Sequence, residues 1–114
     1  MKITKQDTFW VLEDEKDDVK DFASYLTNCI PKNYAKHHLV INLLKYNQLN
    51  LDELILFLEV SNQHRSTNHS FIIVNDAISP DDLPDEMIVV PTLQEAEDVI
   101  GFEAIERELG YKNL

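Results

Sequence analysis

The sequence predicts one α/β domain built around a mostly parallel sheet, and three features of the chain support that class. Its 114 residues match the commonest size of a single domain. Three short runs, at 39–44, 71–75 and 87–90, are almost continuously apolar, as expected of central parallel strands buried on both faces. A helical pattern or a helix-start signal follows each run. The expected architecture over residues 1–114 is therefore β-β-α-β-α-β-α-β-α, with right-handed crossovers.

The N-terminal segment predicts a hairpin at one edge of that sheet. Residues 2–5 and 8–12 have the composition of two short strands, and the turn between them falls at Gln6 and Asp7. Such a close pair is typical of an antiparallel hairpin. We therefore expect the hairpin to lie beside the parallel strands as an edge of the sheet.

The first helix is predicted directly after the acidic segment 13–18. Apolar residues spaced three and four apart mark its inward face, namely Val19, Phe22, Ala23, Leu26 and Ile30. The carboxylates before the first turn are favoured by the helix dipole. Pro31 is expected to end the helix, because proline disrupts a helix interior.

A second helix is predicted to begin after Asn50. Asn50 is a good N-cap, and Glu53 stands three residues later, so that the two form a capping box. The helix should run to about Arg65. Its stripe at helical spacing is predicted to comprise Leu51, Leu54, Ile55, Leu58 and Asn62, widened by Phe57.

Two more helix starts are predicted beyond residue 75. Ser79 offers an N-cap, but Pro84 limits any helix there to about one turn. The segment 92–95 contains a better capping box and opens the last helix. Gly101 is a position where that helix bends or ends, and further turns should lead to Gly110 as the C′ residue. The inward residues are expected to be Leu93, Ala96, Val99 and Ile100.

The charge balance narrows the class of partner. Ten Lys and Arg against 21 Asp and Glu give a formal net charge of −11. A protein that binds duplex nucleic acid needs a basic patch, so we expect no nucleic-acid partner. Anionic membranes and phosphorylated substrates are disfavoured for the same reason. A protein partner with a basic face is favoured, although an acidic surface also serves simply to keep a protein soluble.

The chain gives no sign of a targeting or membrane segment. No apolar run approaches the roughly 20 residues of a membrane-spanning helix. The first ten residues, MKITKQDTFW, lack the apolar core of a signal peptide. The single cysteine, Cys29, excludes an internal disulfide and fits a reducing compartment. We therefore expect a cytoplasmic protein.

No cofactor and no metal ion is predicted. Glycine occurs only twice, whereas phosphate-binding loops need glycine for the close approach of the backbone. His37 and His38 are adjacent at the start of a predicted strand, so their side chains point to opposite faces. His64 and His69 have no Cys, Asp or Glu beside them at ligand spacing. All four histidines are therefore expected at the surface.

The sequence also lacks a recognisable catalytic arrangement. Cys29 falls in the last turn of the first predicted helix, the wrong end of the dipole for a lowered thiol pKa. No serine has the Gly-x-Ser-x-Gly context. Carboxylates are numerous but fall in exposed runs such as 81–86, whereas a catalytic carboxylate needs an enclosed pocket. We expect no enzyme, and the alternative is a small hydrolase or nuclease that uses surface carboxylates.

A degenerate receiver domain is a second alternative. Residues 11–15 (VLEDE) superficially resemble the strand and acidic pair that open response-regulator receiver domains, and the length fits. However, Asn42 lies near the position where a receiver domain has its phospho-accepting aspartate, and this argues against the alternative. No Ser or Thr ends the 71–75 run, and Pro91 stands where Lys-Pro is expected.

The stretch 39–100 resembles a STAS domain, the fold of bacterial anti-sigma-factor antagonists, and in particular small STAS-like proteins of Bacteroidetes-type bacteria. In that family a strand, a polar loop and a helix that opens with Asp-Ser-Ser-Gly-Leu come in sequence. Here residues 39–44 correspond to the strand and residues 50–54 (NLDEL) to the helix start. Residues 92–96 (TLQEA) are similar to the Thr-Leu-Glu-Glu-Ala opening of the last helix. The resemblance implies the fold, and a fold does not fix a function.

The resemblance also implies a phosphorylation switch that this chain lacks. In the antagonists a kinase phosphorylates a serine of the helix-start motif, and that serine corresponds to Asp52. Leu51 replaces the preceding serine and Glu53 replaces the glycine. A first-turn carboxylate is favoured by the dipole and has about half the charge of a phosphate. Asp52 therefore either makes a permanently phosphate-like surface or only stabilises its helix.

We interpret the chain as a non-catalytic, STAS-like regulatory or scaffolding module that binds another protein. The expected surface combines the loop 45–49 with the helix start at 50–53, and the turn at 13–18 contributes. Tyr46 is the candidate anchor, because aromatic residues dominate interface hot spots, and a tyrosine at the edge of the core fits equally well. The candidate contact residues are Tyr46, Asn47, Gln48, Asn50, Asp52 and Glu53.

Overall fold

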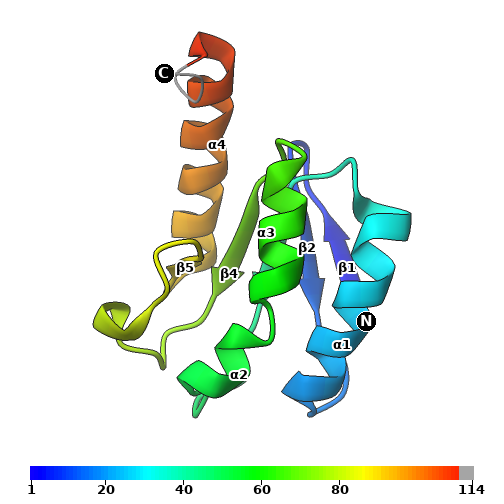
Figure 1. The fold of residues 1–114 in the computed structure, drawn as a ribbon, viewed down its shortest axis with the longest axis vertical. Helices are drawn as coiled ribbons and strands as arrows, with labels where there is room; N and C mark the ends of the chain where they lie inside the picture. The colour runs from blue at the N-terminus through cyan, green and yellow to red at the C-terminus, as the bar shows by residue number, and fades with distance from the viewer. Residues whose placement is uncertain (111–114) are drawn as a thin grey trace.

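The computed structural model describes residues 1–110, with only the backbone of Pro80, and it has the predicted α/β class (Figure 1). Residues 111–114 of the predicted single domain lie outside the described residues. Five strands form one sheet in the order β1-β2-β3-β4-β5. Their bounds are Lys2–Lys5 (β1), Trp10–Glu13 (β2), Leu39–Asn42 (β3), Phe71–Val74 (β4) and Ile88–Val90 (β5).

The pairing of the strands confirms the predicted sheet. β1 and β2 form an antiparallel hairpin at one edge, and β2 to β5 run parallel to their neighbours. The three apolar runs are therefore adjacent, as predicted. β2 begins at Trp10, two residues later than expected, and β3 ends early at Asn42, whose side-chain Oδ1 accepts a hydrogen bond from the N–H of Leu44 at 3.0 Å. This local bond takes the place of continued strand pairing at that residue.

The helices cover the two faces of the sheet unequally. α1 (Val19–Cys29), α2 (Leu51–Ile55) and α3 (Leu58–Ser66) lie on one face, while α4 (Leu93–Leu109) crosses the other (Figure 1). Among the described residues, no helix is long and apolar enough to cross a membrane. The larger core contains Leu12, Leu39, Ile41, Phe71 and Ile73 from the sheet with Phe22, Leu26, Phe57 and Val60. The smaller core contains Val11, Val40, Ile72 and Val74 with Ala96 and Ile100.

The α-helix α1 ends at Cys29, just before Pro31, as predicted, but helical winding does not stop there. α1 begins at its N-cap Asp18, whose carboxylate accepts from the N–H of Asp21 at 3.0 Å, and its predicted apolar face is buried. Helical winding then continues through a π-helix, Ile30–Tyr34. Pro31 lies in the first turn of this π-helix.

The predicted helix from residue 50 to residue 65 is divided into α2 and α3, and this changes which residues face the core. The N–H of Phe57 donates to the carbonyl of Leu54, three residues back, at 3.0 Å, which tightens the chain between the two helices. Leu54 and Phe57 are fully buried by this turn. Leu51 and Ile55 were expected to face inward, and they are exposed instead.

α4 is one continuous helix of 17 residues that passes through Gly101. A single glycine in a helix costs only about 1 kcal/mol relative to alanine, so Gly101 does not end this helix. Gly110, with φ of 74°, is the left-handed residue that follows the last turn, as predicted. Thr92 is the N-cap, but Leu93 is exposed rather than inward. The residues that pack against the sheet as predicted are Ala96, Val99 and Ile100.

The connection between β4 and β5 contains the short turn predicted there. It is a 3-10 helix, Pro80–Asp82. The charged side chains on this connection are exposed, namely Asp76, Asp81, Asp82, Asp85 and Glu86. The connection is therefore a solvated turn, as its composition indicates.

Candidate functional site

The predicted contact residues lie beyond the carboxyl ends of the parallel strands. β2 leads into the acidic turn 14–18, and β3 leads through the loop 45–49 into α2. Figure 1 shows α2 and the start of α1 at this same end of the sheet. Ligands of open α/β sheets commonly bind outside the carboxyl ends of the strands. The fold therefore brings the predicted loop and the acidic turn together at an edge where binding sites form.

Two consecutive residues of the loop, Lys45 and Tyr46, hold the acidic turn. The phenol of Tyr46 donates a hydrogen bond to the carboxylate of Asp14. The Nζ of Lys45 donates to the carbonyl of Asp14 at 2.8 Å and to the carbonyl of Lys16, and it lies 3.2 Å from the carboxylate of Asp17. Burial, together with the hydrogen bond to Asp14, raises the pKa of Tyr46 well above its ordinary range. Tyr46 is therefore a neutral donor that fixes the turn.

Tyr46 has the position of a residue at the edge of the core. It is half-buried, and its side chain packs against the larger core. With its hydroxyl engaged by Asp14, the ring is held in place rather than presented as a projecting anchor. The structure thus shows Tyr46 packed at the edge of the core, and its role as an interface anchor stays a prediction.

A buried asparagine that the sequence interpretation did not single out fixes the path of the loop. Asn75 follows β4, and its Nδ2 donates to the carbonyls of Leu43 and Tyr46 at 2.8 and 3.0 Å. Its Oδ1 accepts from the N–H of Ala77 at 2.9 Å. A buried side-chain amide with its donors and acceptor satisfied specifies one backbone path. The available signal was a polar residue at the end of an otherwise apolar run, FIIVN.

The start of α2 forms the predicted capping box. The Oδ1 of Asn50 accepts from the N–H of Glu53 at 2.9 Å, and the carboxylate of Glu53 accepts from the N–H of Asn50 at 3.2 Å. Both side chains are thus engaged in the helix start. Asn47 and Gln48 are exposed on the loop before it. Asp52 is exposed in the first turn, as predicted, beside a shallow depression that Lys20 also lines.

α2 exposes aliphatic side chains next to Asp52. Leu51, Ile55 and Leu56 are between 37 and 44% exposed, although all three belong to a helix or its cap. We call Leu51, Asp52, Ile55 and Leu56 the α2 surface. The helical pattern of the sequence placed Leu51 and Ile55 inward, because it treated α2 and α3 as one continuous helix.

The histidines lie near the amino-terminal ends of β3 and β4. One of them was predicted at the surface but is buried. His64 is 3% exposed, and its Nε2 donates to the carbonyl of His37 at 2.6 Å. Burial lowers the pKa of His64 to about 4, so it is neutral at pH 7. The ring centroid of His69 lies 5.6 Å from that of His64 and 5.3 Å from that of His38. Within residues 1–110, no group of three or more His, Cys, Asp or Glu side chains could hold a metal ion.

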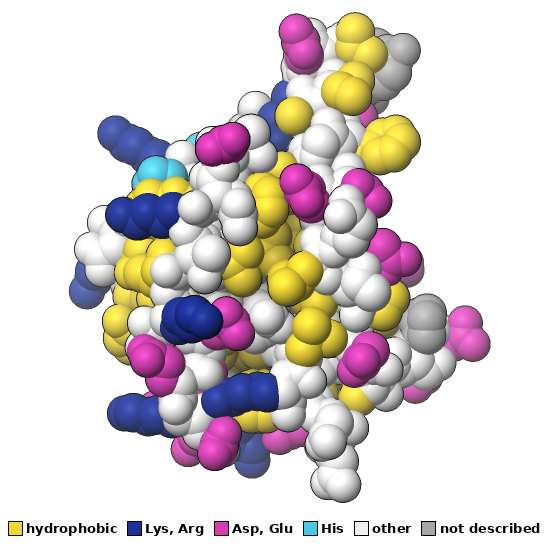
Figure 2. Space-filling view, turned by 180° about the vertical axis from the view of Figure 1, so that it is seen from behind, with side chains coloured by type: hydrophobic (Ala, Val, Ile, Leu, Met, Phe, Trp, Pro, Cys, Tyr) yellow, Lys and Arg dark blue, Asp and Glu magenta, His cyan; other side chains and the backbone are white. Residues whose placement is uncertain are grey.

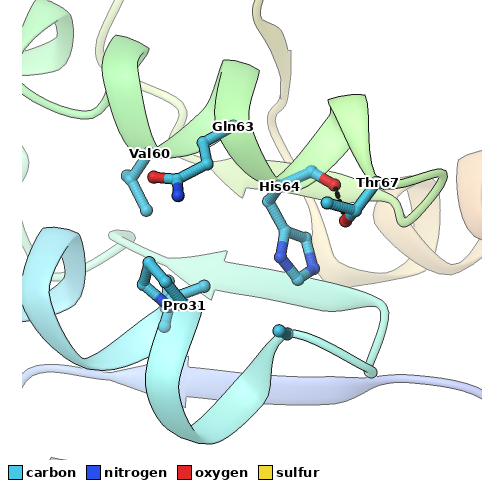
Figure 3. Close-up of a pocket in the computed structure, with 7 residues that line it drawn as sticks. Pro31, Val60, Gln63, His64 and Thr67 are labelled. Carbon is cyan, nitrogen blue, oxygen red and sulfur yellow. Dashed lines mark hydrogen bonds between the residues drawn. The ribbon is translucent and has the colours of Figure 1, made fainter.

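A small apolar cavity lies beside His64, between the π-helix and α3 (Figure 3). Its volume is about 130 Å³. The His64 ring borders it from α3, and Pro31 faces it from the π-helix. The Thr67 hydroxyl is occupied by a hydrogen bond of 2.7 Å to the carbonyl of His64. The other side chains that line the cavity are Ile30, Ala35, Val60 and Gln63.

The remaining candidates for chemistry have structural surroundings. Cys29 is buried, and burial raises the pKa of its thiol, which opposes formation of the nucleophilic thiolate. Asn42 caps the turn after β3, and the carboxylate of Asp14 accepts from Tyr46 and from the N–H of Lys16 at 3.0 Å. What the carboxyl edge presents to solvent is therefore an acidic and aliphatic surface on a fixed backbone.

The comparisons with known proteins add no family to this description. A scan of protein-family models found none that matches the chain, and a search of curated proteins found no match.

Proposed function

We propose that this chain is a non-catalytic regulatory or scaffolding module, STAS-like in fold, that binds another protein through the α2 surface. The observation that supports the proposal most directly is the outward position of Leu51, Ile55 and Leu56 on a helix whose start is fixed by a capping box. The proposal keeps the cytoplasmic location expected from the sequence.

Burial of the α2 surface would provide the binding free energy. Fully burying one Leu or Ile side chain is worth about 1.5–3 kcal/mol, and each of these three still exposes a large part of its area. Asn75 and the capping box hold the neighbouring backbone in one conformation, so little chain entropy remains to be lost on binding. A small surface of this kind fits a specific and reversible contact.

The charge around the α2 surface favours a partner with a basic face. Asp52 and Glu53 lie in the first turn of α2, and the chain as a whole has a net charge of −11. Asp52 holds the position at which the resemblance places a phosphorylated serine, and its carboxylate gives a constant negative charge there. We infer that binding at this surface is constitutive rather than switched by a kinase.

Four versions of the purified protein test the proposal. Wild type, Asp52→Lys and the double variant Leu51→Gln/Leu56→Gln are used as baits in a lysate of the native host. Tyr25→Gln, which changes a 50% exposed side chain on α1, is the matched control. The captured protein is then produced and titrated against each bait, beside the thermal midpoint of every variant.

We expect wild type and Tyr25→Gln to bind the captured protein with equal affinity. The other two variants should bind at least about tenfold more weakly, since hot-spot contacts are worth 1 kcal/mol or more. Their thermal midpoints should stay close to that of wild type, because the changed side chains are exposed. Equal affinity across all four proteins would remove the α2 surface from the proposal.

A further inference from the structure

The second half of α4 has its charged and apolar faces inverted relative to an ordinary surface helix. Glu103 and Arg107 face the body of the protein, while Phe102, Ile105 and Leu109 are 69, 55 and 59% exposed. A surface helix normally turns its apolar stripe to the core and its charges to water. The packing of residues 1–110 therefore does not account for these outward apolar residues.

The inward charges hold α4 in this orientation. The carboxylate of Glu103 accepts from the guanidinium of Arg65 at 2.5 Å and from the hydroxyl of Ser70 at 2.6 Å. The guanidinium of Arg107 donates to the same hydroxyl at 2.9 Å. Burial alone would raise the pKa of Glu103, but the hydrogen bonds from Arg65 and Ser70 and the two guanidinium charges lower it. Rotating α4 to bury its apolar residues would leave these partly buried charges unpaired, so the outward stripe is fixed.

The exposed large apolar residues in the second half of α4 form one stripe. Phe102, Ile105 and Leu109 follow one another at spacings of three and four residues, which places them on one side of a helix. At 1.5 Å per residue the stripe is about 10 Å long. Figure 2 shows hydrophobic and acidic side chains next to each other along the part of α4 that stands beyond the rest of the molecule. We call these three residues the α4 stripe.

The exposed charged side chains of α4, within the part of the chain that the structure describes, are all negative. Arg107 is the only basic residue of α4, and it faces inward. The exposed charged residues nearest the stripe are Asp98, Glu106 and Glu108. A second copy of this chain would set one acidic helix against another. A partner with lysine or arginine beside an apolar seam would meet opposite charge along the whole stripe.

We propose that the α4 stripe is a second docking surface and that its occupant is a basic amphipathic helix of another protein. The partner helix places apolar residues at i, i+3 and i+4 spacing against Phe102, Ile105 and Leu109. Its lysines or arginines flank that seam and face the acidic residues of α4. This is the helix-packing mode in which a few apolar anchors give affinity and the flanking charges give orientation.

The α4 stripe is independent of the α2 surface. α4 covers the face of the sheet opposite to α1, α2 and α3. An occupant of one surface therefore leaves the other free, and the module is able to hold two partners at once. Failure of one surface in its own test leaves the other proposal standing.

A designed peptide tests the α4 stripe without knowledge of the natural partner. The probe is a fluorescent 14-residue helical peptide of Leu and Lys, with Leu at i, i+3 and i+4 spacing. Two matched peptides replace every Lys by Glu or every Leu by Gln. Each peptide is titrated into wild type, Phe102→Gln/Ile105→Gln, Glu106→Gln and the control Tyr25→Gln. Gln keeps a good helix propensity in α4.

We expect the Leu/Lys peptide to bind wild type and Tyr25→Gln in a 1:1 complex. The double variant should bind it about tenfold or more weakly with an unchanged thermal midpoint, and Glu106→Gln should bind less tightly with a smaller salt dependence. The Leu/Glu peptide should not bind. The proposal is overturned if the double variant retains wild-type affinity, or if the Lys/Gln peptide binds equally well, which would reveal charge attraction alone. A wild-type dimer that the double variant abolishes in sedimentation equilibrium would overturn it too, by identifying a second copy as the occupant.

Discussion

The phenol of Tyr46 donates a hydrogen bond to the carboxylate of Asp14, 32 positions earlier in the chain. This bond joins the loop after β3 to the turn after β2. Lys45 reinforces it with bonds to the carbonyls of the same turn. Two connections of neighbouring parallel strands are thus locked together at the carboxyl edge, beside the α2 surface.

Removing the Tyr46 hydroxyl should destabilise the fold. Tyr46→Phe keeps the ring in the larger core but leaves the half-buried carboxylate of Asp14 without its phenol donor. We expect the free energy of unfolding to fall by about 1 kcal/mol, the usual net worth of a hydrogen bond of this kind. Urea unfolding at pH 7 measures it. Tyr25→Phe, on an exposed ring, should change the value by less than about 0.5 kcal/mol, and equal effects of the two changes would contradict the role given to Tyr46.

Asn75 should contribute more to the free energy of unfolding than its size suggests. Asn75→Ala removes both bonds that its Nδ2 donates, and it leaves the carbonyls of Leu43 and Tyr46 without that donor near the core. We expect a loss of about 2–3 kcal/mol in the free energy of unfolding, because an unsatisfied buried polar group costs its desolvation. Asn47→Ala, on the exposed loop, is the matched control and should lie within about 0.5 kcal/mol of wild type. A loss below 1 kcal/mol for Asn75→Ala would mean that water or a small shift of the loop replaces the amide.

Burial of His64 should make stability depend on pH below 7. Its pKa is about 4 in the folded protein, against about 6.5 in an unfolded chain. Between these values the unfolded state binds a proton that the folded state does not, so stability falls as the pH falls from about 6.5 to about 4. The full contribution is about 3 kcal/mol, at 1.36 kcal/mol per pKa unit.

The difference between wild type and His64→Gln isolates this contribution from that of the carboxylates. The free energy of unfolding, measured at several values between pH 4 and pH 8, should decline more steeply below pH 6.5 in wild type than in the variant. Asn47→Ala, which removes no titratable group, is the control, and its curve should stay parallel to that of wild type. Parallel curves for wild type and His64→Gln would show that the pKa of His64 is the same in the folded and the unfolded protein.

The sequence predicts the sheet well because local signals and tertiary packing agree there. Apolar runs at 39–44 and 71–75 can be buried on both faces only as central strands, and this is how β3 and β4 are placed. The division of the second helix could not be predicted, because Leu51 and Leu54 fit a single inward stripe equally well. The backbone hydrogen bond from Phe57 to Leu54 lies in the turn between α2 and α3. In this arrangement Leu54 is buried and Leu51 is exposed.

The sequence predicted the position of the candidate site and the exposure of Asp52, but not the exposed aliphatic residues beside it. The capping box at Asn50 and Glu53 is a local pattern, so the sequence alone predicts it correctly. The bonds of Tyr46 and Asn75 reach side chains or carbonyls about 30 residues away, and no local pattern encodes them. The same limit applies to α4, where the partners of Glu103 decide that Phe102 points outward.

Substitutions of Asp52 distinguish its two candidate roles, which are stabilising the helix and binding a partner. It is exposed in the first turn of α2, where the N-terminal N–H groups favour a negative charge. Asp52→Ala should therefore lower the free energy of unfolding by only about 0.3–1 kcal/mol, and Asp52→Lys by somewhat more, because a cation there opposes the dipole. Both effects should shrink in high salt.

A partner at the α2 surface should respond far more strongly than stability does. Asp52→Asn keeps the size of the side chain and removes the charge, so it separates charge from shape. If Asp52 faces a basic partner, affinity should fall in the order wild type, Asn, Lys, while the thermal midpoints of the three proteins stay within a few degrees. Titration of the partner captured by wild type, at two salt concentrations, measures this order. Affinity that follows the thermal midpoint rather than the charge would assign Asp52 to the helix alone.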